Sequence, residues 1–507
     1  MKFLRKYHKW LGLLSIVFVI LFSFSGIILN HRQLVSNIDI DRSLLADEYQ
    51  YNNWNNAAVK GTEKISNDSI LIYGNIGVWL TDSTFSDFKD FNNGFPAGID
   101  NKKISRIFID DKGNILAGSL FGLFKYHKDS SKWEKITLPI KEKRIADITQ
   151  KQDTTIILSR SHLLKSVDNK HFTVHTLPAP ENYNNKVSLF KTLFIIHSGE
   201  IAGTPGKLFV DILGLLLIFL SVGGMILFIN PKLIKRRKKK KKNRDILIKF
   251  TRWNIRWHNK IGWMSFIFMV ILVITGMFLR PPLLIPIAYT KVAPIPYSNL
   301  DSRNPWNGKL RRIIYDEQHN KYILATANKL YYSDDNFSSE IKIFKKQPPI
   351  SVMGVNLLKL LDDNTILIGS FSGLFRFYPE SSYVQNYITK KEFLKPKYVG
   401  MPLGEYMVTG YSDDFLDKEV YFDFNYGAKI INDTTDFVTI PNKIKYQPMS
   451  LWNFALEVHT ARIYQSFLGL FYMLIIPLSG LLMLFILFSG FIIWKKRYKG
   501  QRKRKHN

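Results

Sequence analysis

Five histidines lie near the ends of long apolar segments, where an ionisable side chain is costly. They are His8, His31, His197, His258 and His459. Because a neutral imidazole is a good axial ligand for haem iron, these positions indicate iron ligation rather than acid–base catalysis. The sequence contains no cysteine, which excludes disulfides, thiolate metal sites and cysteine nucleophiles.

An internal repeat matches four of these histidines in two pairs. Sliding YHKWLGLLSIVFVILFSFSG by 250 places lands on WHNKIGWMSFIFMVILVITG, so that His8 corresponds to His258. FIIHSGEI likewise matches LEVHTARI, so that His197 corresponds to His459. We expect His8 and His258 to ligate one haem b near the cytoplasmic face. His197 and His459 are expected to ligate a second haem b near the outer face.

Small residues recur beside these histidines at helical spacing. Steps of four and three lead from His8 to Gly12, Ser15 and Gly26, and the same steps lead from His258 through its own repeat. The pairs Gly223-Gly224 and Ser489-Gly490 bring similar residues to the other apolar segments. Such residues would leave room for a flat macrocycle against the backbone. The alternative is that they only let membrane helices pack closely.

Three further residues are candidates for the same site. His31 could replace or supplement the outer histidine pair, although a histidine at a helix C-terminus is also favoured by the helix dipole. Arg280 and Arg462 are candidates for binding haem propionates or an anionic substrate. Both arginines could equally be anchors at the membrane surface.

Four apolar runs have the length needed for membrane spans, which is roughly 20 residues. They are 11–30, 208–230, 261–279 and 469–494. Of the 71 lysines and arginines, 26 lie in 1–10, 231–260 and 495–507, which four spans place on one side. By the positive-inside rule that side is cytoplasmic, so the net charge of +30 is a topology signal rather than a sign of nucleic-acid binding. Binding of anionic lipid by the lysine run is the alternative.

The first run is expected to be retained as an anchor, because it is too long for a signal peptide and lacks a small-x-small cleavage site. Each half of the chain then contains a helix, an outer segment and a second helix, in a parallel duplication about an axis along the membrane normal. The expected order is helix 1 (1–30), outer β segment A (31–200), helix 2 (201–230), basic cytoplasmic loop (231–257), helix 3 (258–280), outer β segment B (281–458), helix 4 (459–494) and basic cytoplasmic tail (495–507).

The outer segments alternate in the period of β-strands. ILAGSLFGLFKYHKDSS recurs as ILIGSFSGLFRFYPESS at an offset of 251, and related sequences recur every 40 to 45 residues, about three in each half. This spacing is typical of propeller blades. The segments also resemble propeller repeats of bacterial sensor proteins. Six repeats could close one ring, although two separate β-rich domains fit the pattern as well.

The quoted helix motifs, with IIHSGEIAGTPGKL and VHTARIY, resemble the PepSY-associated transmembrane helix family, which includes ferric-siderophore reductases and iron-regulated inner-membrane proteins. The resemblance covers roughly a third of the chain. It implies haem in the helical bundle, held by His8, His197, His258 and His459, and electron transfer to an outer ferric chelate. Two features depart from the family: Ala461 stands where HTG is typical, and the outer segments are more blade-like than a PepSY domain.

We therefore expect a multi-pass protein of the bacterial inner membrane, with cytoplasmic termini and a large periplasmic domain, that reduces a ferric siderophore for iron uptake. Its partners would be membrane lipid, the ferric chelate, and a quinol or cytoplasmic reductase as electron donor. The sequence contains no P-loop, GxGxxG, nucleophile elbow or HExxH motif. The competing hypothesis is a non-catalytic assembly or sensor subunit whose β domain binds a protein or peptide.

Overall fold

The computed structural model describes residues 1–394 and 404–505, with side chains beyond Arg497 left out. The chain divides into two compact units, each built from separated stretches of sequence. The helical unit comprises 1–35, 185–302 and 451–507, and the β unit comprises 36–184 and 303–450. Both outer segments therefore contribute to a single β unit.

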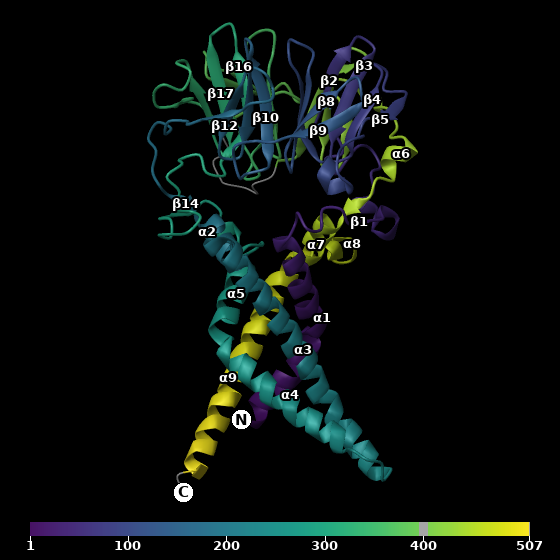
Figure 1. The fold of residues 1–507 in the computed structure, drawn as a ribbon, viewed down its shortest axis with the longest axis vertical. Helices are drawn as coiled ribbons and strands as arrows, with labels where there is room; N and C mark the ends of the chain where they lie inside the picture. Colours follow the sequence, from purple (N-terminus) through teal and green to yellow (C-terminus); the bar gives the residue numbers. More distant parts are fainter. Residues whose placement is uncertain (395–403, 506–507) are drawn as a thin grey trace. The chain divides into compact units, whose positions relative to one another are not determined.

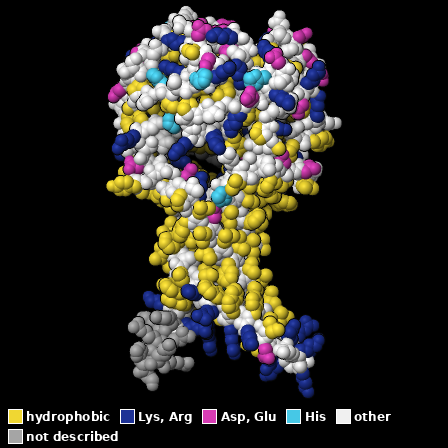
Figure 2. All heavy atoms as spheres, in the orientation of Figure 1, with side chains coloured by type: hydrophobic (Ala, Val, Ile, Leu, Met, Phe, Trp, Pro, Cys, Tyr) yellow, Lys and Arg dark blue, Asp and Glu magenta, His cyan; other side chains and the backbone are white. Residues whose placement is uncertain are grey.

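Three helices of the helical unit are long and apolar enough to cross a membrane, counted over the described residues. They contain α1 (Lys2–Asn30), α3 (Gly203–Lys239) and α9 (Ile475–Lys505). α1 contacts both α3 and α9. Large apolar side chains such as Leu14 and Phe24 are exposed along α1, as lipid contact requires. Figure 2 shows apolar side chains covering this unit, with lysines and arginines gathered at the end where α9 terminates.

The third apolar run is not one straight helix. α4 (Asp245–Met264) and α5 (Phe266–Phe278) meet at Ser265 with a bend of 64°, and together they would make a fourth span. The Ser265 hydroxyl donates a hydrogen bond to the Ile261 carbonyl at 2.7 Å, a contact that often bends helices. The single straight helix expected over 258–280 is therefore replaced by a bent pair.

The basic segment expected as a loop at 231–257 is mostly helical. α3 continues to Lys239 and α4 begins at Asp245, which leaves only a short turn between them. Lysine and arginine have high helix propensity, and four basic residues in the last turn of α3 interact favourably with the helix dipole.

Two short helices of nine residues each end in a histidine of the repeat. They are α2 (Leu189–His197) and α7 (Leu451–His459). The Ser188 hydroxyl caps α2 by accepting a hydrogen bond from the Lys191 backbone N–H. α2 contacts α5, and α7 contacts α1. His197 and His459 thus lie on separate short helices ahead of the long apolar ones. The remaining elements of the unit are β14 (Val187–Ser188), β15 (Lys291–Val292), η4 (Glu200–Ala202), η5 (Ile285–Ile287), η6 (Arg462–Tyr464), α8 (Gln465–Leu468) and η7 (Gly469–Leu474).

The β unit consists of antiparallel meanders in which strands pair in chain order. The first half contains β2 (Gly61–Ser66), β3 (Ser69–Gly74), β4 (Gly77–Thr81) and β5 (Phe88–Asp90), then β6 (Ile104–Ile109), β7 (Ile115–Ser119), β8 (Leu123–His127) and β9 (Lys132–Ile136), then β10 (Ile145–Lys151), β11 (Thr154–Ser159), β12 (Leu163–Ser166) and β13 (Thr173–His175). Each quoted repeat falls on the second and third strands of a meander.

The second half repeats this arrangement. It contains β16 (Leu310–Asp316), β17 (Lys321–Thr326), β18 (Leu330–Ser333) and β19 (Lys342–Ile343), then β20 (Val355–Leu360), β21 (Ile366–Ser370), β22 (Gly373–Tyr378) and β23 (Tyr383–Asn386), then β24 (Val408–Phe415), β25 (Lys418–Asp423) and β26 (Gly427–Ile430). β24 and β2 pair in parallel at Gly61 and Tyr411, which joins the last and first meanders into one seven-stranded sheet. β1 (Asp39–Ile40) pairs with β27 (Met449–Ser450), and the short helices η1 (Arg42–Leu44), η2 (Asp47–Tyr49), η3 (Ile99–Lys102) and α6 (Asn442–Lys445) complete the unit.

Six apolar clusters form the core of the β unit, and each lies between consecutive meanders. The cluster between the last and first meanders contains Trp54, Trp79 and Phe422, all nearly inaccessible to solvent. The first strands β2, β6, β10, β16, β20 and β24 also contact one another in this order, and β24 contacts β2. Burial of these large side chains supplies the main stabilisation of the unit.

Candidate functional site

The four repeat histidines all lie in the helical unit, and each packs against a turn of a neighbouring helix. His197 at the end of α2 lies against α5, with its Nδ1 3.0 Å from the Leu272 carbonyl oxygen and 3.4 Å from the Thr275 hydroxyl. A Cβ on Gly276 would lie 2.7 Å from the His197 Cε1. Only glycine therefore allows the imidazole this close to the α5 backbone.

His459 makes the equivalent contacts with α1. Its Nδ1 lies 3.0 Å from the Phe22 carbonyl oxygen and 3.1 Å from the Ser25 hydroxyl. A Cβ on Gly26 would lie 3.2 Å from the His459 Cε1. The contact residues on α1 and α5 are separated by 250 positions, the same offset as the sequence repeat.

The structure brings His197 and His459 together. Their ring centroids lie 6.0 Å apart with an angle of 50° between the ring planes. Two metal–nitrogen bonds of about 2 Å each, with the ring radii added, would separate the centroids by roughly this distance. The spacing is thus large enough for one iron atom between the two imidazoles.

His8 on α1 packs against α9 in the same way. Its Nδ1 lies 3.1 Å from the Ile486 carbonyl oxygen and 3.0 Å from the Ser489 hydroxyl. A Cβ on Gly490 would lie 3.0 Å from the His8 Cε1. Gly12, one turn along α1 from His8, faces open space, because a Cβ there would meet nothing within 4 Å.

His258 on α4 packs against α3, but its surroundings differ. Its Nδ1 is buried near the Leu220 backbone but forms no hydrogen bond with any described residue, and a Cβ on Gly224 would lie 3.8 Å from its Cε1. Gly223 occupies the position where the other helices carry serine or threonine. The buried Asn254 fills that space by donating a hydrogen bond to the Gly223 carbonyl at 2.9 Å. His258 lies within electrostatic range of His8.

We call the turn that receives each histidine its contact motif, defined by a backbone carbonyl, a small residue three positions on and a glycine four positions on. The four contact motifs are Phe22–Gly26, Leu272–Gly276, Ile486–Gly490 and Leu220–Gly224. A carbonyl oxygen can only accept, so an Nδ1 beside it must carry the proton. The hydroxyls of Ser25, Thr275 and Ser489 each donate to a carbonyl of their own helix, which leaves the hydroxyl oxygen to accept from Nδ1.

This arrangement leaves the other ring nitrogen available. Within the described part of the chain, no residue forms a hydrogen bond with Nε2 of His8, His197, His258 or His459. A histidine that donates through Nδ1 to a carbonyl presents its Nε2 lone pair, which is the usual orientation of a metal-ligating imidazole. His8, His197 and His459 are therefore oriented as ligands, whereas no hydrogen bond among the described residues fixes the proton of His258.

The remaining predicted residues are placed differently. The His31 Nε2 lies 2.7 Å from an Asp211 carboxylate oxygen, while the Asn30 side-chain amide donates to the other oxygen of that carboxylate at 2.8 Å. His31 thus has an ion-pair partner on α3 rather than a contact motif. Arg280 lies within electrostatic range of Arg462 and His459, and Arg462 pairs with Glu457.

The small-residue dipeptides of the contact motifs have a different role from the one that the sequence predicted. The dipeptides Ser25-Gly26, Thr275-Gly276 and Ser489-Gly490, with Gly223-Gly224, were expected to leave room for a macrocycle. In the structure they receive the histidine of another helix. Each dipeptide lies three and four residues after the backbone carbonyl that the histidine faces. This relation can be recognised only once the packing of the helices is known.

A second concentration of polar side chains lies at the centre of the β unit. Five of its first strands begin with a β-bulge, a feature that redirects the side chain that follows it. The residues that follow the bulges are Arg106, Asp147, Arg312, Leu357 and Gly410. The first four of them line a cavity of about 60 Å³, which has room for about two water molecules.

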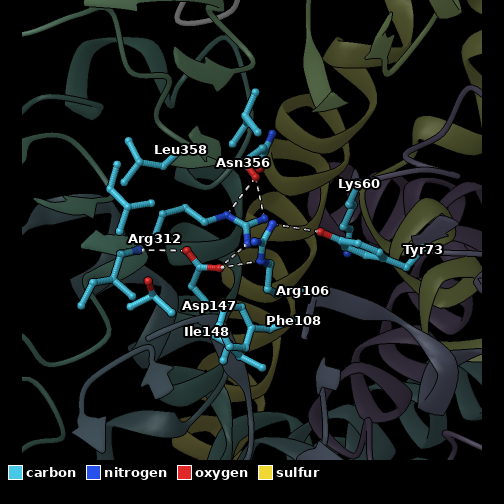
Figure 3. Close-up of a pocket in the computed structure, with 13 residues that line it drawn as sticks. Lys60, Tyr73, Arg106, Phe108, Asp147, Ile148, Arg312, Asn356 and Leu358 are labelled. Carbon is cyan, nitrogen blue, oxygen red and sulfur yellow. Dashed lines mark hydrogen bonds and ion pairs between the residues drawn. The ribbon is translucent and has the colours of Figure 1, made fainter. Parts of the chain in front are cut away.

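Arg312 lines this cavity and joins several strands through its guanidinium group (Figure 3). Its guanidinium donates to the Asn356 carbonyl, to the Ser105 carbonyl at 3.1 Å and to the Ala146 carbonyl at 3.2 Å. It also pairs with Asp147 at 3.3 Å. A buried arginine with this many partners holds strands together, and we interpret it as structural.

Arg106 completes the network from β6. It lies 3.5 Å from the Tyr73 hydroxyl, 3.5 Å from a Glu63 carboxylate oxygen and 4.0 Å from Asp147. Burial raises the pKa of Tyr73 and of Glu63. The mixture of charges and the small volume indicate a closed polar core rather than a site for a large ligand.

A family model described as the PepSY-associated TM region matches residues 1–230 and 173–497. The chain belongs to this family. The match to the PepSY-associated TM region includes all four histidines and all four contact motifs. It identifies the protein as a membrane protein, in agreement with the long apolar helices of the helical unit.

Other comparisons give only distant similarity, and no curated protein matches the chain. The extracellular domain of the putative one component system BT4673 from B. thetaiotaomicron is similar at 11% identity and TM-score 0.36, over 78% of this chain and 35% of that one. PorZ, a bacterial surface component of the type-IX secretion system of Porphyromonas gingivalis, is similar at 10% identity and TM-score 0.33, over 76% and 32%. The chain spans about a third of the length of these two proteins.

Proposed function

We propose that this member of the PepSY-associated TM region family holds two haem b groups and transfers electrons across a membrane to a ferric chelate. The observation that carries the proposal is that three of the four repeat histidines, His8, His197 and His459, bind a backbone carbonyl through Nδ1 and leave Nε2 free. Interfacial packing alone would not require the same nitrogen to be engaged at all three.

The outer pair, His197 and His459, fits a haem best. Their ring centroids lie 6.0 Å apart, so these two imidazoles would be able to hold one haem iron between them. Arg280 lies within electrostatic range of His459 and of Arg462, so these arginines would be candidates for binding propionate groups. In the inner pair, His8 and His258 lie within electrostatic range of each other, and the open space beside Gly12 and Gly262 leaves room next to both.

The chain's own residues hold and orient the ligands. At His8, His197 and His459 the contact-motif carbonyls fix the proton on Nδ1, the hydroxyls share it, and the glycines let each ring approach a helix backbone closely. Haem supplies reversible one-electron chemistry when bound, and two such groups near opposite ends of the helices suit transfer of electrons across the membrane. Reduction of the substrate would release iron, because Fe(II) binds hard oxygen chelators more weakly than Fe(III).

The proposal includes a topology of four spans, with α4 and α5 acting together as the third. Both termini and the basic turn after α3 would then be cytoplasmic, and the β unit would lie outside the inner membrane of a bacterium. The 250-residue offset between the contact motifs on α1 and α5, which equals that of the sequence repeat, supports a parallel duplication with its axis along the membrane normal. The cyclic order of apolar clusters supports a six-bladed propeller rather than two β domains.

The electron donor would be a membrane quinol or a cytoplasmic reductase, because the sequence carries no recognisable nicotinamide or flavin motif. The substrate would be a ferric siderophore or a similar chelate. The histidines act in this proposal as iron ligands and not as acid–base groups.

An absorption spectrum of the full-length protein, purified from haem-replete cells, tests the proposal. We expect a b-type Soret band that shifts on addition of dithionite. His459→Ala and His258→Ala should each remove about half of the bound haem, because each pair would hold one group. His127→Ala, at an exposed histidine of β8, is the matched control and should retain the full spectrum.

Reoxidation tests the substrate. Protein reduced with dithionite and freed of the excess should be reoxidised by a ferric chelate, with release of Fe(II) to a ferrous indicator. Colourless wild-type protein would contradict the haem proposal and favour a non-catalytic assembly or sensor subunit. Pigmented protein that no ferric chelate reoxidises would retain the electron-transfer function and exclude this substrate class.

A further inference from the structure

Three arginines of the β unit lie within electrostatic range of one another. Arg144 directly precedes β10, Arg160 lies in the turn between β11 and β12, and Arg311 is the second residue of β16. The Leu310 backbone N–H donates to the Arg160 carbonyl at 3.0 Å, which brings this turn against β16. Three separate elements thus place positive charges close together.

Arg160 is the least compensated of these charges. Its side chain is half-buried, and no residue within 1–394 or 404–497 forms a hydrogen bond or ion pair with its guanidinium. Burial and the nearby charges of Arg311 and Arg144 lower the pKa of Arg160 to about 8. Burying arginine without an anionic partner is unfavourable, so the fold maintains this arrangement at a cost.

Arg311 is also incompletely satisfied. Its Nη1 donates to the Gly308 and Leu310 carbonyls, but its Nε is buried and has no hydrogen-bond partner among the described residues. Burial and the charge of Arg144 lower the pKa of Arg311 to about 10. Gly354 lets the guanidinium approach the backbone, because a Cβ there would lie 2.7 Å from the Arg311 Nε.

Glu142 offsets part of the charge of Arg160 and Arg311, and it is already engaged. Glu142 accepts a hydrogen bond from the Ser159 hydroxyl at 2.7 Å and lies 3.7 Å from the His162 Nδ1. The segments whose side chains are not described, 395–403 and 498–507, contain no aspartate or glutamate. The chain therefore offers this part of the β unit much more positive than negative charge.

We propose that Arg144, Arg160 and Arg311 form a binding site for a small anion that carries several carboxylate groups. Guanidinium groups bind carboxylates through paired hydrogen bonds, and three of them within electrostatic range of one another match a polycarboxylate better than a neutral ligand. Resting on the proposed function, this assigns the substrate class: a negatively charged ferric polycarboxylate, of which ferric citrate is an example. Neutral or cationic hydroxamate chelates would lack the matching charge.

The binding test uses metal-free citrate, because citrate needs no haem to bind. Calorimetry on the detergent-solubilised full-length protein should detect citrate binding that weakens as salt is added, since the contacts are ionic. Arg160→Gln and Arg311→Gln should each weaken citrate binding at least tenfold. Lys132→Gln removes one positive charge at an exposed position of β9 and should leave the affinity unchanged.

Further variants separate binding from folding and from redox function. Arg160→Lys keeps the charge and should retain affinity between those of wild type and Arg160→Gln, while the melting temperatures of all variants are compared. His459→Ala should bind citrate like the wild type even if its pigment is lost. If the wild type is colourless but binds citrate, the redox proposal fails and this site remains.

Two results would overturn the site. The first is wild-type protein that binds no citrate, or that binds inorganic phosphate more tightly than citrate. The second is Arg160→Gln and Arg311→Gln protein that binds citrate as tightly as Lys132→Gln protein.

Discussion

The outer and inner histidine pairs are built from one repeat, yet their contacts are unequal. The outer histidines, His197 and His459, both lie against a motif with a carbonyl, a hydroxyl and a glycine. In the inner pair only His8 has all three, because Gly223 replaces the hydroxyl residue beside His258. His258 also lacks a hydrogen bond at its buried Nδ1. The comparison therefore suggests that the outer pair is held more firmly than the inner pair.

Asn254 explains how the exception is tolerated. Its side chain is almost fully buried and donates to the Gly223 carbonyl, so it occupies the volume that a serine side chain fills elsewhere. A Cβ on Gly223 would lie 2.8 Å from the Asn254 Oδ1. At the contact motif of α3, the side-chain amide of Asn254, which lies on the same helix as His258, thus takes the place of the hydroxyl found in the other motifs.

The largest difference should come from the glycines. Gly276→Ala should strongly reduce haem bound at the outer pair, because its new methyl group would lie 2.7 Å from the His197 ring. Gly224→Ala should leave the inner pair nearly unchanged, since the corresponding distance to His258 is an ordinary 3.8 Å. Haem content per chain measures both. Equal losses would show that the glycines do not act through ring contact.

A smaller effect should follow from Asn254→Ala. The substitution leaves a space beside Gly223 and removes a hydrogen bond within the buried part of the helical unit, which costs about 1–3 kcal/mol. We expect the inner haem to be lost more readily than the outer one when the protein is warmed. A spectrum recorded during a thermal melt should therefore show two steps that lie further apart than in the wild type. Unchanged steps would mean that Asn254 does not support His258.

The smallest effect should come from the hydroxyls. Ser489→Ala removes an oxygen 3.0 Å from the His8 Nδ1, whereas Thr275→Val removes one 3.4 Å from the His197 Nδ1. Since partners of the second ring nitrogen adjust ligand basicity, each variant should shift the midpoint potential of its own haem. The shift should be larger for Ser489→Ala. A redox titration that ranks the two variants in the opposite order would contradict this dependence on distance.

The sequence predicted the family and the membrane helices because both depend on local patterns. Apolar runs of span length and a repeat with a constant offset are visible without tertiary structure. It also singled out the four histidines that the structure places against turns of neighbouring helices. Their use as haem ligands remains a prediction.

The packing of helices could not be predicted in the same way. Ser15 and Ser265 are equivalent in the repeat, but Ser15 donates to the Gly12 carbonyl within a continuous helix, whereas Ser265 lies at the 64° bend. The contact motifs also depend on which helix faces which histidine. The cluster of Arg144, Arg160 and Arg311 was missed because its members are far apart in sequence and meet only through β10 and β16.

The parallel pairing of β2 with β24 has a consequence for how the protein is made. The free edge of β2 obtains its partner strand only after residue 411 has been synthesised. The first three meanders are therefore complete in sequence, but lack this pairing, while two further apolar segments are translated. An unpaired strand edge is prone to join other chains during such a delay. Cells that produce this protein would therefore be expected to protect the nascent first half with a chaperone until translation is nearly finished.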